Sequence, residues 1–299
     1  MIVAGLLLPG LVLTTNPGFL SASTPDAVEG LTGPLLLLLL GGLLLLIGLV
    51  VSAVRAVIVR GQLPAARYRG PAIGVLLLLG LIAGGVVSLG AAGTLVALFD
   101  GGDLTVGGTL ILLTSTQLGL LAVTGGLVVA PRALAGVRLS PPSGRARSML
   151  IGLALAVPAW VGATLLGLVA ALLLEAIGFT QDVGVLDQVV ERGDTTVVLL
   201  AFLLVAPVAE ELFFRGVVFN AWLRERGPRV ALYGSAALFA AIHTNLFSLA
   251  PIFALGVALA LLYRSTRSLP AAMAMHAGFN AISVGITLLA REGILQLPT

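Results

Sequence analysis

The sequence predicts an all-α fold, that of a polytopic membrane protein with about eight transmembrane helices. Of the 299 residues, 59% are hydrophobic and only 10% are charged, whereas about a quarter of the residues in a soluble domain are charged. The apolar residues form long runs, and most runs have the roughly 20 residues that a helix needs to cross a bilayer. Basic and acidic loops alternate between these runs, as expected for helices that cross in alternating directions.

Composition also excludes several classes of function. The chain has no cysteine, so it has no disulfide framework, no thiolate nucleophile and no cysteine-bound metal. Its net charge is +3 and all 16 basic residues are arginine. These arginines lie in short loops, where they orient a membrane protein, so we expect no nucleic-acid partner. The arginine-only, Ala-, Gly- and Leu-rich composition is typical of a GC-rich prokaryote, which predicts a multi-pass protein of the prokaryotic cell membrane.

Four spans are predicted in the first part of the chain, at about 31–59, 71–99, 108–130 and 149–178. Residues 2–14 precede them but contain Pro9 and lack a basic flank, so they are a poor signal peptide and a poor span. Basic loops follow the first and third spans, and acidic segments follow the second and fourth. The basic loops should be cytoplasmic. No residue within these spans is predicted to have more than a structural role.

Four more spans are predicted in the second part, at about 195–220, 230–248, 251–263 and 268–290. Arginines follow the first and third of these, so both chain ends should lie outside if the N-terminal segment does not cross. No repeat or soluble segment interrupts the pattern. We therefore predict an N-terminal transmembrane region, residues 1–194, followed by a helical core, residues 195–299, that carries the site.

The fifth predicted span contains three charged side chains, Glu210, Glu211 and Arg215. At the centre of a membrane helix each charge costs about 2.5–3.5 kcal/mol, while a good apolar residue returns only about 0.3–0.6 kcal/mol. An intramembrane charge is therefore by default a sign of a functional site. The alternative is a buried charge cluster that only locks the packing of helices.

A helical wheel gives the two glutamates different roles. At about 100° per residue, Arg215 lies about 40° from Glu211 and about 140° from Glu210. Glu211 and Arg215 are an i,i+4 pair with the acid first, so we expect them to neutralise each other. Glu210 is then the candidate reactive carboxylate. Pro207 cannot donate to the carbonyl of Leu203 and should kink or loosen the helix one turn before the acids.

The chain has only two histidines, His243 and His276, and both fall within predicted spans that follow the charged one. His276 and Asn280 are four residues apart, so their side chains should point from one helical face toward a shared position. Phe239 and His243 have the same spacing. Each histidine alone could be a hydrogen-bonded core residue, but together with the charged cluster the set favours a reactive site.

The residues that are missing limit this chemistry. The sequence shows no nucleophile elbow, no His-Glu-x-x-His motif and no readable Ser-His-Asp arrangement, so the nucleophile should be water. A carboxylate can act as the general base, a histidine can position the water, and imidazole and carboxamide N–H groups can stabilise an oxyanion. This combination predicts hydrolysis of an amide bond within the membrane.

Two histidines and a glutamate could also form a zinc site, which needs three converging ligands. If Glu210, His243 and His276 all bound zinc, the remaining base would be Glu211, which the wheel assigns to a salt bridge. We therefore expect a glutamate-type mechanism with no metal and no cofactor. A metalloprotease is the alternative.

Three motifs follow one another on the hydrophobic helices: Glu210-Glu211-x-x-x-Arg215, Phe239-x-x-x-His243 and His276-x-x-x-Asn280. In this order they resemble the motifs of the CAAX-protease and bacteriocin-processing (CPBP) family, which includes the type II CAAX prenyl endopeptidases. The resemblance covers about residues 195–290, roughly a third of the chain. It implies an intramembrane endopeptidase whose substrate is a membrane-associated protein or peptide in the lipid bilayer.

The resemblance also implies a role for each motif residue. The implied roles are water activation by Glu210 and His243, oxyanion binding by His276 and Asn280, and support of the first glutamate by Glu211 and Arg215. Two other functions stay open: a non-catalytic membrane scaffold or immunity protein of the same family, and a proton-coupled transporter. A transporter would more usually have repeated halves, whereas the first four spans have no counterpart of the charged motif.

Overall fold

The structure, a computed structural model, describes part of the chain. The described residues are 40, 43–44, 47–48, 51, 70–77, 79–80, 99–100, 103–104, 114, 117–126, 144–180, 199–243 and 245–295. Its named elements are the strands β1 (Phe99–Asp100) and β2 (Asp103–Leu104), the α-helices α6 (Arg145–Ala176), α9 (Ala206–Glu211), α10 (Phe219–Arg226), α11 (Pro228–Ala241), α12 (Leu249–Thr266) and α13 (Leu269–Arg291), and the π-helical segments η2 (Ala201–Val205) and η3 (Leu212–Val218). A shorter apolar helix, Gln117–Gly126, precedes α6.

The predicted all-helical class is confirmed, with one small exception. β1 and β2 form an antiparallel ladder in which Phe99 pairs with Leu104 and Asp100 with Asp103, at the acidic turn expected after the second span. Among the described helices, α6, α12 and α13 are long and apolar enough to cross a membrane. The total of eight spans stays a prediction, because the first three expected spans lie largely outside the described residues.

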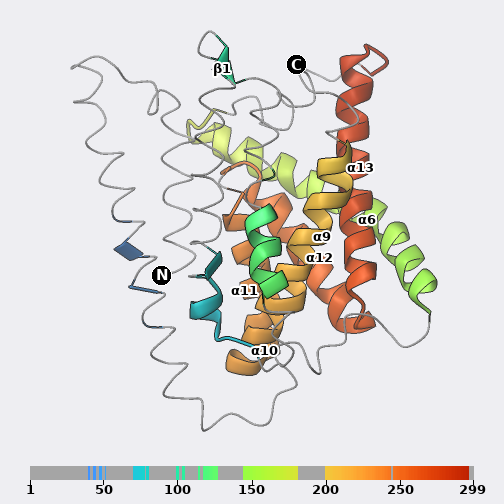
Figure 1. Cartoon of the computed structure of the whole chain (residues 1–299). Coiled ribbons are helices and arrows are strands. Elements are labelled where there is room, and N and C mark those ends of the chain that lie inside the picture. Colours follow the sequence, from blue (N-terminus) through green and yellow to red (C-terminus); the bar gives the residue numbers. More distant parts are fainter. Residues whose placement is uncertain are drawn as a thin grey trace.

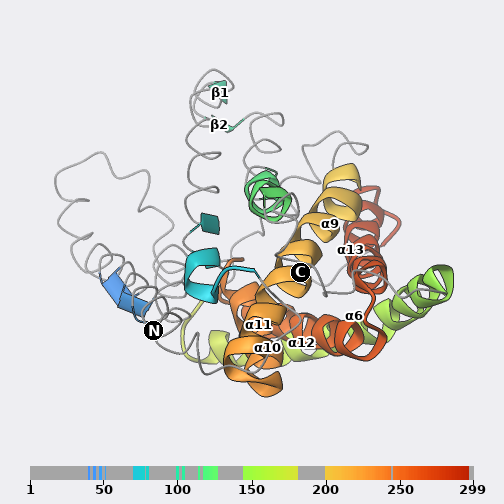
Figure 2. The same cartoon turned by 60° about the horizontal axis from the view of Figure 1, so that its bottom comes forward.

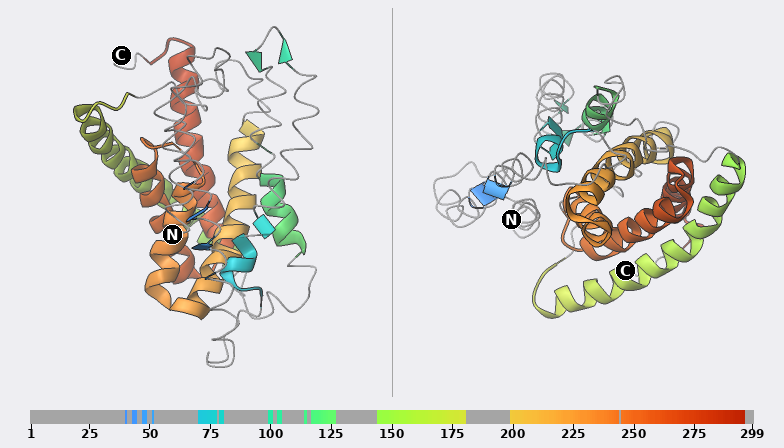
Figure 3. Two further views of the ribbon diagram at one scale, coloured as in Figure 1. Left: turned by 90° about the vertical axis from the view of Figure 1, so that its left-hand side faces the viewer. Right: turned by 90° about the horizontal axis from the view of Figure 1, so that it is seen from below.

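The helices of the second part of the chain form a ring. Seen from below, the segment from η2 to α10 and the helices α11, α12 and α13 enclose an oval (Figure 3). α6 runs obliquely along the outside of this oval, where it packs on α13 and α12 (Figure 1). The helix Gln117–Gly126 lies on the other side, beside α9 (Figure 2). The ring therefore carries all the predicted site residues and is flanked by helices from the first part of the chain.

α6 combines a lipid-like surface with a narrow contact face. Large apolar side chains such as Leu150 and Leu173 are about two-thirds exposed, at 65% and 64%, which suits a helix surrounded by lipid. Its buried residues are all small: Ser148, Gly152, Ala156 and Ala163. A methyl group added to Gly152 would collide with the carbonyl of Ala271 in α13. Small residues thus let the two helices approach closely, as is common within membranes.

The sixth predicted span, about 230–248, is too long, and this corrects the placement of one site residue. α11 ends at Ala241. The N–H of His243 bonds to the carbonyl three residues back, and Asn245 Oδ1 accepts from the N–H of Ser248, a local bond that competes with continued helix. The prediction that His243 lies within a helix is therefore wrong, because it lies in the turn after α11.

Candidate active site

The helix that carries the two glutamates has an irregular backbone. Residues 199–226 are helical without a break, but η2 and η3 are π-helical on either side of α9. π-Helical turns are rare and occur frequently at functional sites. Pro207 lies in the first turn of α9, directly after η2. The loosening predicted at Pro207 is thus confirmed.

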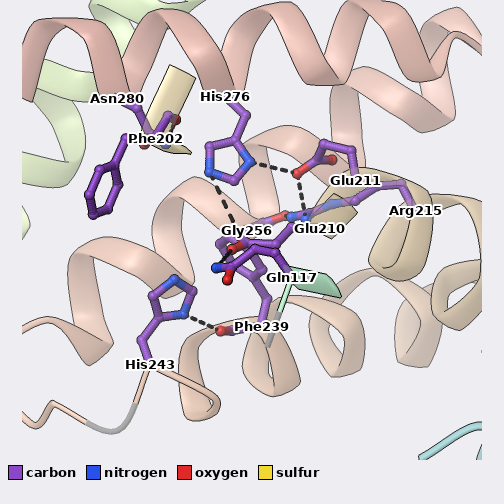
Figure 4. A network of polar contacts seen from close by, with 10 residues as sticks. All are labelled: Gln117, Phe202, Glu210, Glu211, Arg215, Phe239, His243, Gly256, His276 and Asn280. Atoms are coloured by element: carbon purple, nitrogen blue, oxygen red, sulfur yellow. Dashed lines mark hydrogen bonds and ion pairs between the residues drawn. The ribbon is translucent and has the colours of Figure 1, made fainter. Parts of the chain in front are cut away.

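A side chain from α13 completes the hydrogen bonds of η2. The N–H of Ala206 donates to the carbonyl of Ala201, five residues back. In this register the next donor would be Pro207, which has no N–H, so the register offers the carbonyl of Phe202 no backbone donor. Asn280 Nδ2 donates to that oxygen at 2.8 Å. Asn280 therefore ties α13 to the turn that precedes the glutamates (Figure 4).

Glu211 and Arg215 form the predicted ion pair. Both side chains are fully buried, and Arg215 Nη1 lies 2.9 Å from Glu211 Oε1. Arg215 Nη2 donates to the carbonyl of Gly256 in α12 at 3.0 Å, and the guanidinium carbon lies 4.6 Å from the ring centroid of Phe239 in α11. The pairing predicted from the helical wheel is confirmed, and the arginine also joins three elements of the ring.

His276 lies between the two glutamates. Its Nδ1 is 3.0 Å from Glu211 Oε1, and its Nε2 is 3.9 Å from Glu210 Oε2. A carboxylate paired with an arginine can only accept, so Nδ1 must carry the hydrogen. The atom of His276 that faces Glu210 is therefore Nε2, at a distance too long for a direct hydrogen bond.

Glu210 has one bonded and one unbonded carboxylate oxygen. The side chain is buried, with 5% of its surface exposed. Oε1 accepts a hydrogen bond of 3.3 Å from Gln117 Nε2. Oε2 is buried and has no hydrogen-bond partner among the described residues. Glu211 Oε2 is likewise buried without a partner among the described residues. The two carboxylates differ at their other oxygen, because Glu211 Oε1 is held by Arg215 and His276, whereas Glu210 Oε1 accepts only from an amide.

Gln117 is the site residue that sequence analysis missed. It belongs to the third predicted span, for which only a structural role was expected, and the contact to Glu210 joins positions 93 residues apart. One signal could have found it: Gln117 is the only Asn or Gln within the first four predicted spans. Polar groups inside the membrane are costly and often functional.

His243 reaches the site through Phe239. Its Nδ1 lies 2.7 Å from the carbonyl of Phe239, so Nδ1 carries the hydrogen and Nε2 is the acceptor of the neutral ring. The Phe239 ring packs edge-on against both histidines, with centroid distances of 5.0 Å to His243 and 5.7 Å to His276. His243 is partly exposed. Figure 4 shows the two rings on opposite sides of Glu210 and Gln117.

The structure thus brings the charged motif and His276 into one network and places Asn280 apart from it. His276 and Asn280 lie on one helix as predicted, but they bond to different partners, Glu211 and Phe202. Their convergence on a common oxygen of the substrate stays a prediction. The described residues contain no group of three His, Asp or Glu side chains placed to hold one metal ion.

Comparison with known proteins gives one finding. Residues 192–282 match the family model described as type II CAAX prenyl endopeptidase Rce1-like. This part of the chain is similar to the Rce1-like family. The match confirms the CPBP-family prediction, and it includes all three motifs of the Rce1-like segment. The family is one of proteases, which together with the apolar helices supports a protease in a membrane. No curated protein and no solved structure matches the chain.

Proposed function

We propose that this protein is an intramembrane endopeptidase that uses Glu210 to activate water for the hydrolysis of a peptide bond. The observation that carries the proposal is the free oxygen of Glu210, since Oε2 is buried, lacks a described hydrogen-bond partner and lies 3.9 Å from His276 Nε2. An unsatisfied buried polar group costs about 1–3 kcal/mol, and more if it is charged. Such a cost is reasonable at a group that reacts. The Rce1-like match supports the same class of reaction.

In the proposed reaction Glu210 takes one proton from water while the water oxygen adds to the carbonyl carbon of the substrate. The carbonyl oxygen then carries the negative charge. When the C–N bond breaks, Glu210 returns the proton to the leaving amine. We assign the positioning of the water to His243, because its Nδ1 is held by the carbonyl of Phe239 and its Nε2 remains as an acceptor.

The oxyanion role of His276 and Asn280 sets conditions on both side chains. His276 donates from Nδ1 to Glu211, so it can donate from Nε2 as well only as an imidazolium, whose charge Glu211 would stabilise. Asn280 uses one N–H of its amide on the carbonyl of Phe202. The amide has a second N–H for the oxyanion. The roles proposed for Glu211 and Arg215 are to orient His276 and to keep the second carboxylate neutralised.

A metalloprotease is the second candidate, and one contact favours it. A carboxylate that accepts from one ring nitrogen commonly orients the other nitrogen toward a metal, and Glu211 stands in this relation to His276. In the described part of the chain, however, no third His, Asp or Glu side chain lies where it could bind the same metal ion as His276 and Glu210. This arrangement of donors supports the glutamate-type mechanism.

The membrane setting defines the class of substrate. A CAAX-type protease in the bilayer acts on a membrane-associated protein or peptide, and we propose the same class of substrate here. We also propose that the protease itself is a multi-pass protein of the prokaryotic cell membrane. We propose that residues 195–299 form the catalytic unit and that residues 1–194 form the N-terminal transmembrane region. The hydrogen bond from Gln117 to Glu210 supports including the first region in the site.

The proposal is tested by comparing the membrane proteomes of a wild-type strain and a Glu210→Gln strain for precursors that remain uncut. Glu210→Gln keeps the shape of the side chain and removes the base, so turnover should fall by about 10²–10⁴-fold. Glu292→Gln is the control, because it makes the same change at an exposed position beyond α13. Identical proteomes with an intact cellular phenotype would favour the scaffold or immunity function. Loss of proton uptake without any uncut precursor would favour the transporter.

A further inference from the structure

Gln117 lies outside the family-matched segment and yet is the described hydrogen-bond donor to Glu210. Its Nε2 lies 3.3 Å from Glu210 Oε1, and it begins a short apolar helix that flanks α9 from the side opposite α6 (Figure 3). The one arginine in the network is directed elsewhere, with Nη1 on Glu211 and Nη2 on the carbonyl of Gly256. The orientation of the Glu210 carboxylate thus depends on an amide from the first part of the chain.

Donor and acceptor rules make this contact informative. The terminal atoms of a glutamine can only be assigned from the surrounding hydrogen bonds. An ionised carboxylate can only accept hydrogen bonds, so a Glu210 that acts as a general base takes N–H from the amide of Gln117. With Oε1 occupied in this way, the proton acceptor for a substrate water is Oε2.

A purely structural role does not account for Gln117. Its second polar atom, Oε1, is buried and has no hydrogen-bond partner among the described residues. Leaving a carbonyl oxygen unsatisfied costs about 1–3 kcal/mol, and a methionine or leucine would fill an apolar helix face without that cost. Three buried side-chain oxygens lack a partner among the described residues, and two of them, Gln117 Oε1 and Glu210 Oε2, belong to side chains that are bonded to each other. Paired free acceptors of this kind are suited to a water molecule, which has two hydrogens to donate.

We propose that Gln117 is a positioning residue for Glu210, holding Oε1 so that Oε2 is presented to the reacting water. The inference rests on the proposed function of Glu210 as the base. It assigns a part in the site to a region of the chain for which the family match gives no role.

The first test needs no substrate. Infrared difference spectra of the full chain in lipid nanodiscs, wild type minus Glu210→Gln at neutral pH, isolate the carboxylate stretch of Glu210. Repeating the subtraction in a Gln117→Met background should shift that band, because Met has a similar length but no donor. Gln117→Asn should shift it too, since the amide is one methylene too short to reach, and it serves if Met impairs folding. Thr124→Val is the control, because it removes a hydroxyl that bonds within the same helix.

An unshifted band in both Gln117 variants, or the absence of any carboxylate band for Glu210 at neutral pH, would overturn the inference. The second test uses the precursor that accumulates in the Glu210→Gln strain. Loss of one hydrogen bond in Gln117→Met should lower kcat by about three- to tenfold and leave KM unchanged, while Thr124→Val should change neither. A rise in KM alone would make Gln117 a substrate contact. If wild type cuts no precursor, the proposed function fails, and the infrared result still decides whether Gln117 orients Glu210.

Discussion

The same isosteric change to glutamine should lower stability at Glu211 and activity at Glu210, although the two residues are adjacent in sequence. Glu211→Gln removes the partner of a guanidinium that is fully buried. At 2.9 Å and an effective dielectric constant near 20, the lost Coulomb attraction is about 6 kcal/mol. Part of this is offset because burial of the carboxylate no longer opposes folding, and measured losses for breaking a buried pair are about 3–5 kcal/mol.

The other contacts of Arg215 place the expected loss of stability near the lower end of this range. After the change Arg215 keeps its bond to the carbonyl of Gly256 and its position over the ring of Phe239, and each contact stabilises the charge by about 1–3 kcal/mol. The carboxamide oxygen of the new side chain can still accept from Arg215 and His276. We therefore expect Glu211→Gln to lower the free energy of unfolding by about 3 kcal/mol. Glu210→Gln should change it by less than about 1 kcal/mol, because within the described part of the chain Glu210 has one weak hydrogen bond and only a distant contact, 3.9 Å, with His276.

The measurement is the equilibrium free energy of unfolding in bicelles for both variants and for the double variant Glu211→Gln/Arg215→Gln. The double variant removes both charges, so it should recover much of the loss, as expected when a buried pair is replaced as a unit. Activity gives the second readout, since Glu210→Gln should abolish turnover in a folded protein. Equal losses of stability and equal residual activity in the two single variants would refute the division of roles.

Three further predictions concern other parts of the chain. Asn280→Ala should lower kcat by on the order of 10²–10³-fold with little change in KM. It should also lower the free energy of unfolding by about 1–3 kcal/mol, because it removes the hydrogen-bond donor to the carbonyl of Phe202. A change in KM alone would make Asn280 a substrate contact. In the cysteine-free chain, single cysteines at Arg145 and Arg226 should be protected from impermeant labels applied outside, while one at Asp187, which lies outside the described residues, should react; labelling at 226 would reverse the topology. Purified enzyme should keep its activity in a strong zinc chelator and contain no stoichiometric metal, whereas activity that is lost on removal of zinc and restored on its return would establish the metalloprotease mechanism.

The features that follow from local geometry could be predicted from the sequence. The cost of charge in lipid singled out Glu210, Glu211 and Arg215, and the i,i+4 spacing predicted the ion pair that the structure contains. Pro207 lacks an N–H whatever its surroundings, so a disturbed turn before the glutamates was expected as well, and η2 confirms it. Such inferences depend only on residues within one or two turns of a helix.

Two features of the site could not be predicted: the end of the helix before His243 and the helix that packs beside Glu210. Hydropathy placed His243 in a helix because Ile242, Leu246 and Phe247 continue the apolar run, but the local bond of Asn245 to Ser248 accompanies a turn instead. Gln117 was missed because periodicity carries no information on which helix packs beside which. The first error concerns where an element ends and the second concerns which elements meet, and helical spacing within one element addresses neither question.

Asn280 has one role that was predicted from helical spacing and another that the structure shows as a contact between helices. Its spacing from His276 predicted a donor directed at a substrate. In the structure it donates to the carbonyl of Phe202, to which the register of η2 and Pro207 offers no backbone donor. These roles are compatible. One N–H of the carboxamide donates to the carbonyl of Phe202, and this bond fixes the plane of the amide and so the direction of its second N–H. An oxyanion donor must be fixed before the charge develops, since reorientation during the reaction would use up the stabilisation. The backbone irregularity at Pro207 beside the glutamates thus provides the acceptor that orients Asn280. The same contact links the helix of the proposed base to the helix of the proposed oxyanion donors.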